Sequence, residues 1–187
     1  MDLLPEQTTA LHYVRTRGTE APLESIYARV SRTYTEFEAM VEALTPELAR
    51  EHRATSLWSV QEVVDHLIES DRPAIEQLTQ LLAGQSVDEP IPASLQSSSP
   101  LAHDWAALRR DFHAVHQEIL ALLAAATDEL QTAATAPVQM VVKCAAPDGS
   151  VRPVSWVELF DWKAFAILLH AHNREHMAQV RRILDAR

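Results

Sequence analysis

Three histidines lie within seven residues near the C-terminus, in the stretch HAHNREHMAQVRRIL (170–184). His172 and His176 are four residues apart, so on a helix their imidazoles lie on one face about one turn apart. Two imidazoles at this spacing can chelate one divalent ion. His170 is only two residues from His172 and therefore points to a different face. A solvated helix can show the same spacing, so a metal site needs a further ligand from elsewhere in the chain.

The segment HNREH (172–176) also fits the H-x-x-E-H pattern of inverzincin peptidases, in which Glu175 would be the general base. That family needs a further protein ligand well downstream. Only eleven residues follow His176 (177–187), and Asp185 carries the one carboxylate side chain among them. The sequence therefore disfavours a zinc peptidase. The missing ligand is expected upstream, and His66 is the best candidate.

His66 is predicted to lie on a helix that begins in the segment SLWSVQEVVDHL (56–67). Ser59 and Glu62 form a capping-box pattern, in which each side chain satisfies a free amide near the helix start. Beside the apolar stripe of this helix runs a polar stripe that contains Glu62, His66 and Glu69. Such a stripe faces either solvent or an internal cleft, and the residues alone leave both readings open.

The remaining elements are also expected to be helical. Apolar residues at spacings of three and four predict helices over 23–44, 59–83 and 101–126. Ser155 and Glu158 repeat the capping-box pattern and predict a last helix from there nearly to the C-terminus. Only three glycines are present, and Ala and Leu, which favour helix, are abundant. The expected fold is all-α, a four-helix bundle with one long crossover.

Two parts of the chain have a weaker helical pattern. Residues 1–22 are predicted to form a short N-terminal extension, followed by one bundle domain over 23–187. Residues 127–154 are the least regular, with VQMVVK (138–143) as a short strand and PDGS (147–150) as a turn. A hairpin or a loose excursion is expected there. A Pro/Ser-rich loop is expected over 87–100.

Composition limits the environment and the partners. The net charge of −10 repels a phosphate backbone, so no nucleic-acid partner is expected. Cys144 is the sole cysteine, so no intrachain disulfide can form, and a reducing cytoplasm fits best. No apolar run approaches the ~20 residues of a membrane span, and the N-terminus lacks a signal-peptide pattern. A cytoplasmic protein that does not contact membranes is expected.

The combination of WSVQEVVDHL (58–67) with the late histidine segment resembles the DinB/YfiT-like metalloprotein superfamily. Its members have a Trp-Ser helix start with a histidine eight residues after the tryptophan, and a late H-x-x-x-H followed by Gln. The likeness runs from about residue 23 to 186. The matching residues are Trp58, Ser59, His66, His172, His176 and Gln179. The resemblance implies a four-helix bundle, a metal site of His66, His172 and His176 for zinc or nickel, and a homodimer.

Three protein ligands leave an open coordination position, which is typical of catalytic rather than structural sites. The resemblance implies a metal-dependent S-transferase for a small thiol, such as bacillithiol, mycothiol or glutathione, or a thiol-dependent isomerase like maleylpyruvate isomerase. The substrate would be a small electrophilic molecule. The alternative is a non-catalytic metal-binding or stress-response protein on the same scaffold. No thiol-recognition motif is evident.

Several other side chains have simpler expected roles. Carboxylates near the ligands could orient the imidazoles. Trp58 and Trp156 are expected at helix starts as core side chains. The histidines of the third helix are expected to be exposed or to line a cleft. No histidine is placed by the sequence to activate Cys144 as a nucleophile. The carboxylate candidates are Asp65, Glu62 and Asp161, and the histidines are His103, His113 and His116.

Overall fold

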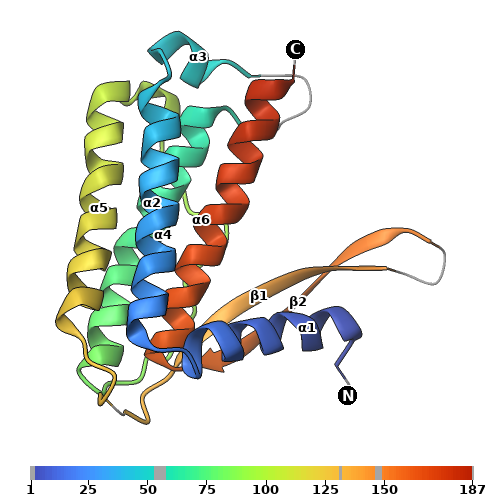
Figure 1. Cartoon of the computed structure of the whole chain (residues 1–187). Coiled ribbons are helices and arrows are strands. Elements are labelled where there is room, and N and C mark those ends of the chain that lie inside the picture. Colours follow the sequence, from blue (N-terminus) through green and yellow to red (C-terminus); the bar gives the residue numbers. More distant parts are fainter. Residues whose placement is uncertain (1–2, 53–57, 131, 146–148, 187) are drawn as a thin grey trace.

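In the described part of the chain, four long helices lie side by side and a β-hairpin extends from one end of them (Figure 1). The computed structural model describes residues 3–52, 58–130, 132–145 and 149–186. The expected four-helix bundle is confirmed, and the structure adds a small two-stranded sheet. The bundle helices are α2 (Leu23–Glu42), α4 (Val60–Leu82), α5 (Trp105–Ala125) and α6 (Trp162–Asp185).

Helices α2 and α4 lie at opposite corners of the bundle, and each of them packs against both α5 and α6. The indole Nε1 of Trp105 donates to the carbonyl of Leu44 at 3.1 Å, and Gln61 Nε2 donates to the carbonyl of His103 at 3.1 Å. The end of α2 and the starts of α4 and α5 therefore share one end of the bundle. Helix α6 starts at the other end, near the base of the hairpin (Figure 1). Neighbours α4 and α5 thus run parallel.

The connection between α4 and α5 must return along the bundle, because the two helices run in the same direction. Residues 83–104 make this long crossover, which contains a 3-10 turn at Pro100–Ala102. The crossover is tied to α4 at two levels. Gln77 Nε2 donates to the carbonyl of Glu89 at 3.0 Å, and the amide of Ser97 donates to Asp65 Oδ2 at 2.9 Å. The second of these hydrogen bonds is made by Asp65, which directly precedes His66 in the sequence.

The predicted cap at the start of α4 is present. The Ser59 amide donates to Glu62 Oε2 at 2.7 Å, and the Glu62 amide donates to Ser59 Oγ at 3.3 Å. Asp104 caps α5 by accepting a hydrogen bond from the Ala107 amide at 2.8 Å. The short helix α3 (Pro46–Arg50) connects α2 toward α4. These caps satisfy amides that have no partner within the helix.

The core lies between the four helices and is filled by aromatic and branched aliphatic side chains. Burying one such side chain contributes about 1.5–3 kcal/mol. None of the described helices combines the length and hydropathy needed to cross a membrane. The largest side chains with almost no exposed surface include Tyr34, Phe37, Trp105, Phe112, Leu67, Leu78 and Ile119.

The hairpin consists of β1 (Ala136–Ala145) and β2 (Val151–Phe160), which pair antiparallel with Ala136 opposite Phe160. A hairpin was one of the two expected arrangements, but the strands are longer than the predicted one. The predicted helix start at Ser155 is wrong, because Ser155 lies in β2 opposite Val141. A capping box depends on four residues only, whereas the ladder satisfies backbone groups along ten residues of each strand.

The N-cap of α6 lies six residues later, where Asp161 Oδ1 accepts a hydrogen bond from the Ala164 amide at 2.9 Å. Trp156 accordingly lies in β2 and not at a helix start. Its indole Nε1 donates to Glu158 Oε2 at 3.3 Å. The capping residue of the last helix is therefore an aspartate, which is as good an N-cap as serine.

The N-terminal helix α1 (Pro5–Val14) continues into a π-helical turn (Arg15–Thr19) and packs against the hairpin and the start of α6. Gly18 makes the closest approach. A Cβ at this position would lie 2.7 Å from the Ala164 Cα, which is closer than side-chain atoms pack. Residues before the bundle are thus in contact with it. Their division into an extension over 1–22 and a domain over 23–187 stays a prediction.

Candidate metal centre

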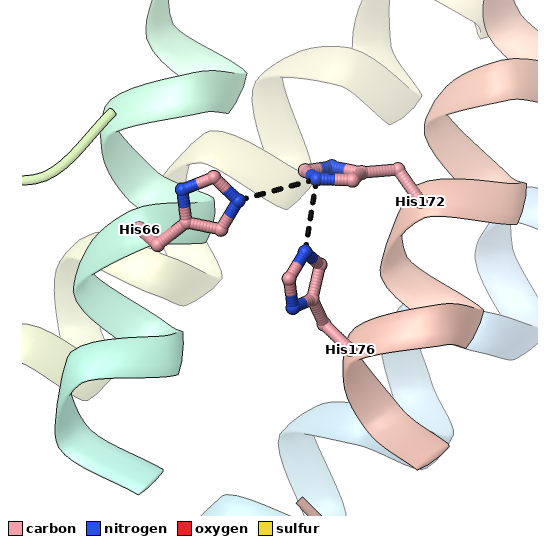
Figure 2. Close-up of side chains that lie close together, drawn as sticks. All are labelled: His66, His172 and His176. Atoms are coloured by element: carbon pink, nitrogen blue, oxygen red, sulfur yellow. Dashed lines mark hydrogen bonds between the residues drawn. The ribbon is translucent and has the colours of Figure 1, made fainter. Parts of the chain in front are cut away.

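The imidazoles of His66, His172 and His176 converge between α4 and α6 (Figure 2). His172 Nε2 lies 3.3 Å from His66 Nε2 and 3.1 Å from His176 Nε2. The three ligand atoms all lie within 4.8 Å of one another, and no other group of three or more His, Cys, Asp or Glu residues in the described ranges is as close. The structure therefore brings together the three histidines selected from the sequence.

Hydrogen bonds at the far sides of two rings set which nitrogen faces the centre. His66 Nδ1 donates to the carbonyl of Leu95 at 2.7 Å, and His176 Nδ1 donates to Gln179 Oε1 at 2.8 Å. With the protons on Nδ1, the Nε2 atoms of both rings carry lone pairs that point toward the centre. His172 can donate one proton to only one of them. The cluster is thus short of donors and suits a cation.

The spacing of the nitrogens matches a metal site. Two nitrogens bound to one zinc ion at about 2.0–2.1 Å with tetrahedral angles are about 3.3–3.4 Å apart. The measured separations of 3.3 and 3.1 Å are close to this value. Imidazoles suit zinc, nickel, copper and iron, so the donor set does not choose among these metals.

All three imidazoles are kept neutral at neutral pH. Burial, together with the neighbouring His176 and His66, lowers the pKa of His172 to about 3. Burial and His66 lower the pKa of His176 to about 4. Burial also lowers the pKa of His66. Neutral rings are the form that binds a metal ion, so none of them has to lose a proton first.

The crossover holds the His66 ring from outside. Asp65 accepts hydrogen bonds from the Ser97 amide at 2.9 Å and from Ser97 Oγ at 2.7 Å. Ser97 lies two residues after Leu95, whose carbonyl accepts the His66 Nδ1 proton. Asp65 was a candidate for orienting a ligand directly. The structure shows that it contacts the segment that does so.

A cavity of about 560 Å³ adjoins the three histidines. Trp58 forms part of its wall, with its ring centroid 5.1 Å from that of His66 and 6.3 Å from that of His176. Trp58 thus borders the site and is also partly buried against the core, in part as expected. The wall combines apolar side chains with a few polar and charged groups. It includes Ile91, Pro137, Met140, Phe165, Leu168, Asp71, Gln77, Glu175 and Arg182.

The other residues of the late histidine segment face different ways. His170 points toward α2, where its Nδ1 lies 2.9 Å from Thr33 Oγ1, as its spacing predicted. Glu175 is exposed and lines the cavity mouth, and Arg174 is exposed. Cys144 is buried in β1 outside the cavity lining, and burial together with Glu6 raises the pKa of its thiol. Among the described residues, the neighbours of Cys144 thus disfavour its thiolate.

The expected roles of the remaining polar candidates are partly corrected. Glu62 caps α4, and Asp161 caps α6, so neither orients a ligand ring in the described structure. His103 contacts Ser97 Oγ through Nε2 at 2.9 Å. His116 was expected to be exposed or to line a cleft, but it is fully buried. The position of His116 in α5 falls on the apolar stripe of that helix, and this could have indicated its burial.

A buried polar layer around His116 was missed from the sequence. It also contains Asp71 and Asn173, each with no exposed surface, and the partly exposed Glu38. Asp71 lies four residues after Leu67 and three before Ala74, so it occupies a position of the α4 apolar stripe. A carboxylate at a core position of a helix is the feature of the sequence that could have revealed it.

The profile of the DinB superfamily matches residues 29–180, which is most of the chain and includes all three converging histidines. The chain belongs to the DinB superfamily. No curated protein matches it significantly. The match lies inside the predicted bundle domain and leaves α1 outside.

Solved structures of other proteins share the fold of this DinB superfamily member. YfiT from Bacillus subtilis, described as a probable metal-dependent hydrolase with an unusual four-helix bundle topology, is 16% identical with a TM-score of 0.63, over 86% of this chain and 85% of that one. A mycothiol-dependent maleylpyruvate isomerase is 10% identical with a TM-score of 0.58, over 88% of this chain but 62% of that one.

The colibactin self-resistance protein ClbS, solved in complex with a dsDNA, is a third neighbour. It is 12% identical with a TM-score of 0.58, over 89% of this chain and 97% of that one. At these identities the likeness shows the fold alone. The neighbours differ in what they act on or bind, so the scaffold does not define one reaction.

Proposed function

We propose that His66, His172 and His176 bind one divalent metal ion, zinc or nickel, and that the site activates a small thiol for transfer to, or isomerisation of, a small electrophilic molecule. The observation that carries the proposal is the convergence of three Nε2 atoms at 3.3 and 3.1 Å beside a cavity. Three neutral imidazoles, two of them held by outward Nδ1 partners, are a metal-binding arrangement with few other uses.

The cavity favours a catalytic metal site over a non-catalytic one. A structural zinc site is closed by four protein ligands, whereas three ligands leave one position for water or substrate. Here the three histidines line a space of about 560 Å³, which is within the range of small-molecule sites. A bound divalent ion would lower the pKa of a thiol or water at the open position.

The residues of the chain have separate tasks in this proposal. The Leu95 carbonyl and Gln179 hold the His66 and His176 rings with their Nε2 atoms inward. Trp58 and the apolar wall exclude water from the reacting atoms. Arg182 lines the cavity and supplies a positive charge for an acidic group on the thiol or substrate.

The mycothiol-dependent isomerase among the structural neighbours supports a thiol as cofactor. A second candidate is hydrolysis by a metal-bound water. It is supported by the carboxylates of Asp71 and Glu175 in the cavity wall, and by the hydrolase description of YfiT. A non-catalytic metal-binding or stress-response role remains the alternative outcome.

The partners and location are proposals as well. A net charge of −10 opposes DNA binding, so we propose a small molecule and not nucleic acid as partner, unlike ClbS with its dsDNA. A cytoplasmic location and a homodimer are proposed from the single cysteine and from the family resemblance.

The test has two steps. Elemental analysis of protein purified without a His-tag should show about one zinc or nickel ion per chain. The loaded protein is then assayed for conjugation of monochlorobimane with bacillithiol, mycothiol and glutathione, each against the chelated protein. Metal-dependent conjugation with one thiol supports transfer. Conjugation that survives chelation contradicts the proposal.

Variants sharpen the assay. Cys144→Ser should keep the full rate, because the thiol cofactor supplies the nucleophile. Loss of rate in a folded, metal-loaded Cys144→Ser protein would contradict the mechanism. Metal-dependent cleavage of model esters in the absence of any thiol would favour hydrolysis instead.

A further inference from the structure

A layer of polar side chains crosses the core of the bundle, and each of the four long helices contributes to it. Glu38 comes from α2, His116 from α5, Asp71 from α4 and Asn173 from α6. His116, Asp71 and Asn173 have no exposed surface. Apolar side chains at these positions would pack without the desolvation cost of three buried polar groups. The layer is therefore a candidate for function.

His116 links the two sides of this layer. Its Nδ1 donates to Glu38 Oε1 at 2.7 Å, and its Nε2 lies 3.9 Å from Asp71 Oδ2 and 3.3 Å from Asn173 Oδ1. The ring is held between Tyr34, stacked at 3.7 Å with a 3° interplanar angle, and Phe112 at 4.1 Å. Nδ1 thus contacts the Glu38 carboxylate, while Nε2 contacts the Asn173 amide oxygen and has the Asp71 carboxylate just beyond hydrogen-bond distance.

The two ends of the line open on opposite sides of the molecule. Asp71 lines the cavity that adjoins the three histidines. Glu38 lies in a surface groove between α2 and α5, together with the exposed His113, whose Nδ1 is 2.9 Å from Glu38 Oε2. Because α4 and α6 lie across the bundle from α2 and α5, the polar layer connects the cavity with the opposite face.

The gap between Asp71 and His116 needs one proton. Neither carboxylate oxygen of Asp71 makes a hydrogen bond of good geometry with the described residues, although the nearby Asn173 side chain partly offsets the rise of its pKa on burial. If His116 is neutral with its proton on Nδ1, its Nε2 is an acceptor, and Asp71 must carry the proton. If Asp71 is ionised, His116 must carry two. Burial raises the pKa of Asp71 to about 7 and lowers that of His116, so the first state dominates below about pH 7.

We propose that Asp71, His116 and Glu38 form a proton relay that exchanges protons between the histidine-lined cavity and solvent on the α2/α5 face. The source of the proton rests on the proposed function, because a thiol or water that enters the centre as its anion releases one. A substrate that fills the cavity blocks its mouth. A path through the core lets the proton leave while the cavity is closed to solvent.

The transfer balances along the line. In the dominant state Asp71 is protonated, so the proton of the entering thiol or water replaces the one that Asp71 gives up to His116. Asp71 passes a proton to His116 Nε2 after a small rotation that closes the 3.9 Å gap, and His116 Nδ1 passes its own proton to Glu38. Glu38 then exchanges with solvent. When the product takes up a proton, the same steps run backwards, and His116 returns to its first tautomer.

The charged and titratable groups that face His116 are few. From α2 they are Tyr34 and Glu38, from α5 His113, and from α4 Asp71, while α6 contributes only the amide of Asn173. Burial and the two carboxylates raise the pKa of Tyr34, so its hydroxyl stays protonated. Among the described residues, Asp71 and Glu38 are thus the two carboxylates that can exchange a proton with His116.

The first test uses the metal-free protein and does not depend on the centre. NMR of protein labelled with ¹⁵N-His and ¹³C-Asp follows the His116 ring and the Asp71 carboxyl between pH 5 and 9. Coupled changes with one shared midpoint are expected. Glu38→Gln, on the far side of the bundle, should lower that midpoint by about one unit, because it removes a negative charge next to His116. Independent titrations, or a His116 ring with one unchanged protonation state, would overturn the relay.

The second test uses the cobalt-loaded protein and glutathione as probe. Stopped-flow absorbance follows thiolate binding to cobalt, and a pH indicator follows proton release. Glu38→Gln and His116→Gln should each slow proton release about tenfold or more, and added imidazole should restore it. His170→Gln removes another buried histidine outside the relay and should leave the rate unchanged. An unchanged rate in Glu38→Gln would refute the relay, whereas failure to bind cobalt would refute the proposed centre and leave the NMR test decisive.

Discussion

Lowering the pH should unfold the metal-free protein steeply, because it buries several histidines in their neutral form. His172 has a pKa of about 3 in the folded chain, and His170 and His176 have pKa values of about 4, whereas an unfolded histidine has a pKa of about 6.5. Between these values the unfolded chain binds protons that the folded chain does not. The stability from neutral histidines is complete above about pH 6.5 and is lost as the pH falls toward 4.

Asp71 opposes this trend with the opposite sign. Its pKa of about 7 in the folded chain exceeds the unfolded value of about 3.9, so below pH 7 the folded state binds one proton more. Three histidine protons in the unfolded state against one Asp71 proton in the folded state leave a net uptake of at least about two on unfolding, to which His66 and His116 add because their pKa values are also lowered in the folded chain. Each proton changes the free energy of unfolding by about 1.4 kcal/mol per pH unit. Near pH 5.5 the free energy of unfolding is therefore expected to change by about 3 kcal/mol per pH unit. Solvent screening of the partly exposed histidines reduces this slope to about 2 kcal/mol per pH unit.

Urea unfolding followed by circular dichroism at several pH values from 5 to 7, with a chelator present, measures this slope. His170→Gln should reduce the slope by about one proton, because that histidine contributes one, and Asp71→Asn should increase it by about one. A slope near zero, or one that does not respond to His170→Gln, would show that these histidines are not held neutral by the fold. Added zinc should raise the stability at pH 7, since it binds only the folded state.

Three further predictions concern the centre and its supports. His66→Ala should abolish stoichiometric metal binding and His170→Ala should retain it in elemental analysis, because only His66 faces the centre; equal losses would contradict the site. Ser97→Ala should weaken metal affinity about 10–100-fold in a competition titration, since it loosens the segment that holds the His66 ring, and an unchanged affinity would show that the crossover plays no part. Gly18→Ala should cost about 1–3 kcal/mol in urea unfolding, because its Cβ would meet the Ala164 backbone at 2.7 Å, while the metal content of the folded fraction should not change.

The helices and two of the three converging histidines follow from local patterns. The four-residue spacing of His172 and His176 places both rings on one face of any helix that contains them, whatever surrounds it. The cap at Ser59 likewise forms from residues three apart, and the structure shows it as predicted. Such features depend on geometry within one or two turns, so the sequence alone can determine them.

The start of the last helix shows where local patterns fail. The pair Ser155 and Glu158 has the same spacing as the cap of α4, yet both residues lie in β2. Whether a segment forms a strand depends on a partner strand that pairs with it, and here β1, which lies earlier in the chain, is that partner. The alternation of exposed and partly buried residues along β2 indicates a strand only when that partner is known.

The sequence by itself determined the helical fold, the facing of His172 and His176 and the separate direction of His170, because a helix repeats regularly and fixes which side chains share a face. It could not decide whether the polar stripe of His66 faces water or a cleft. Only the packing of α4 against α6 decides this, since it brings nitrogens 106 residues apart to 3.3 Å. Packing likewise turns Asp71 and His116 inward to meet across the core. Burial and contact between distant segments depend on how helices are arranged in space, and no local spacing contains that arrangement.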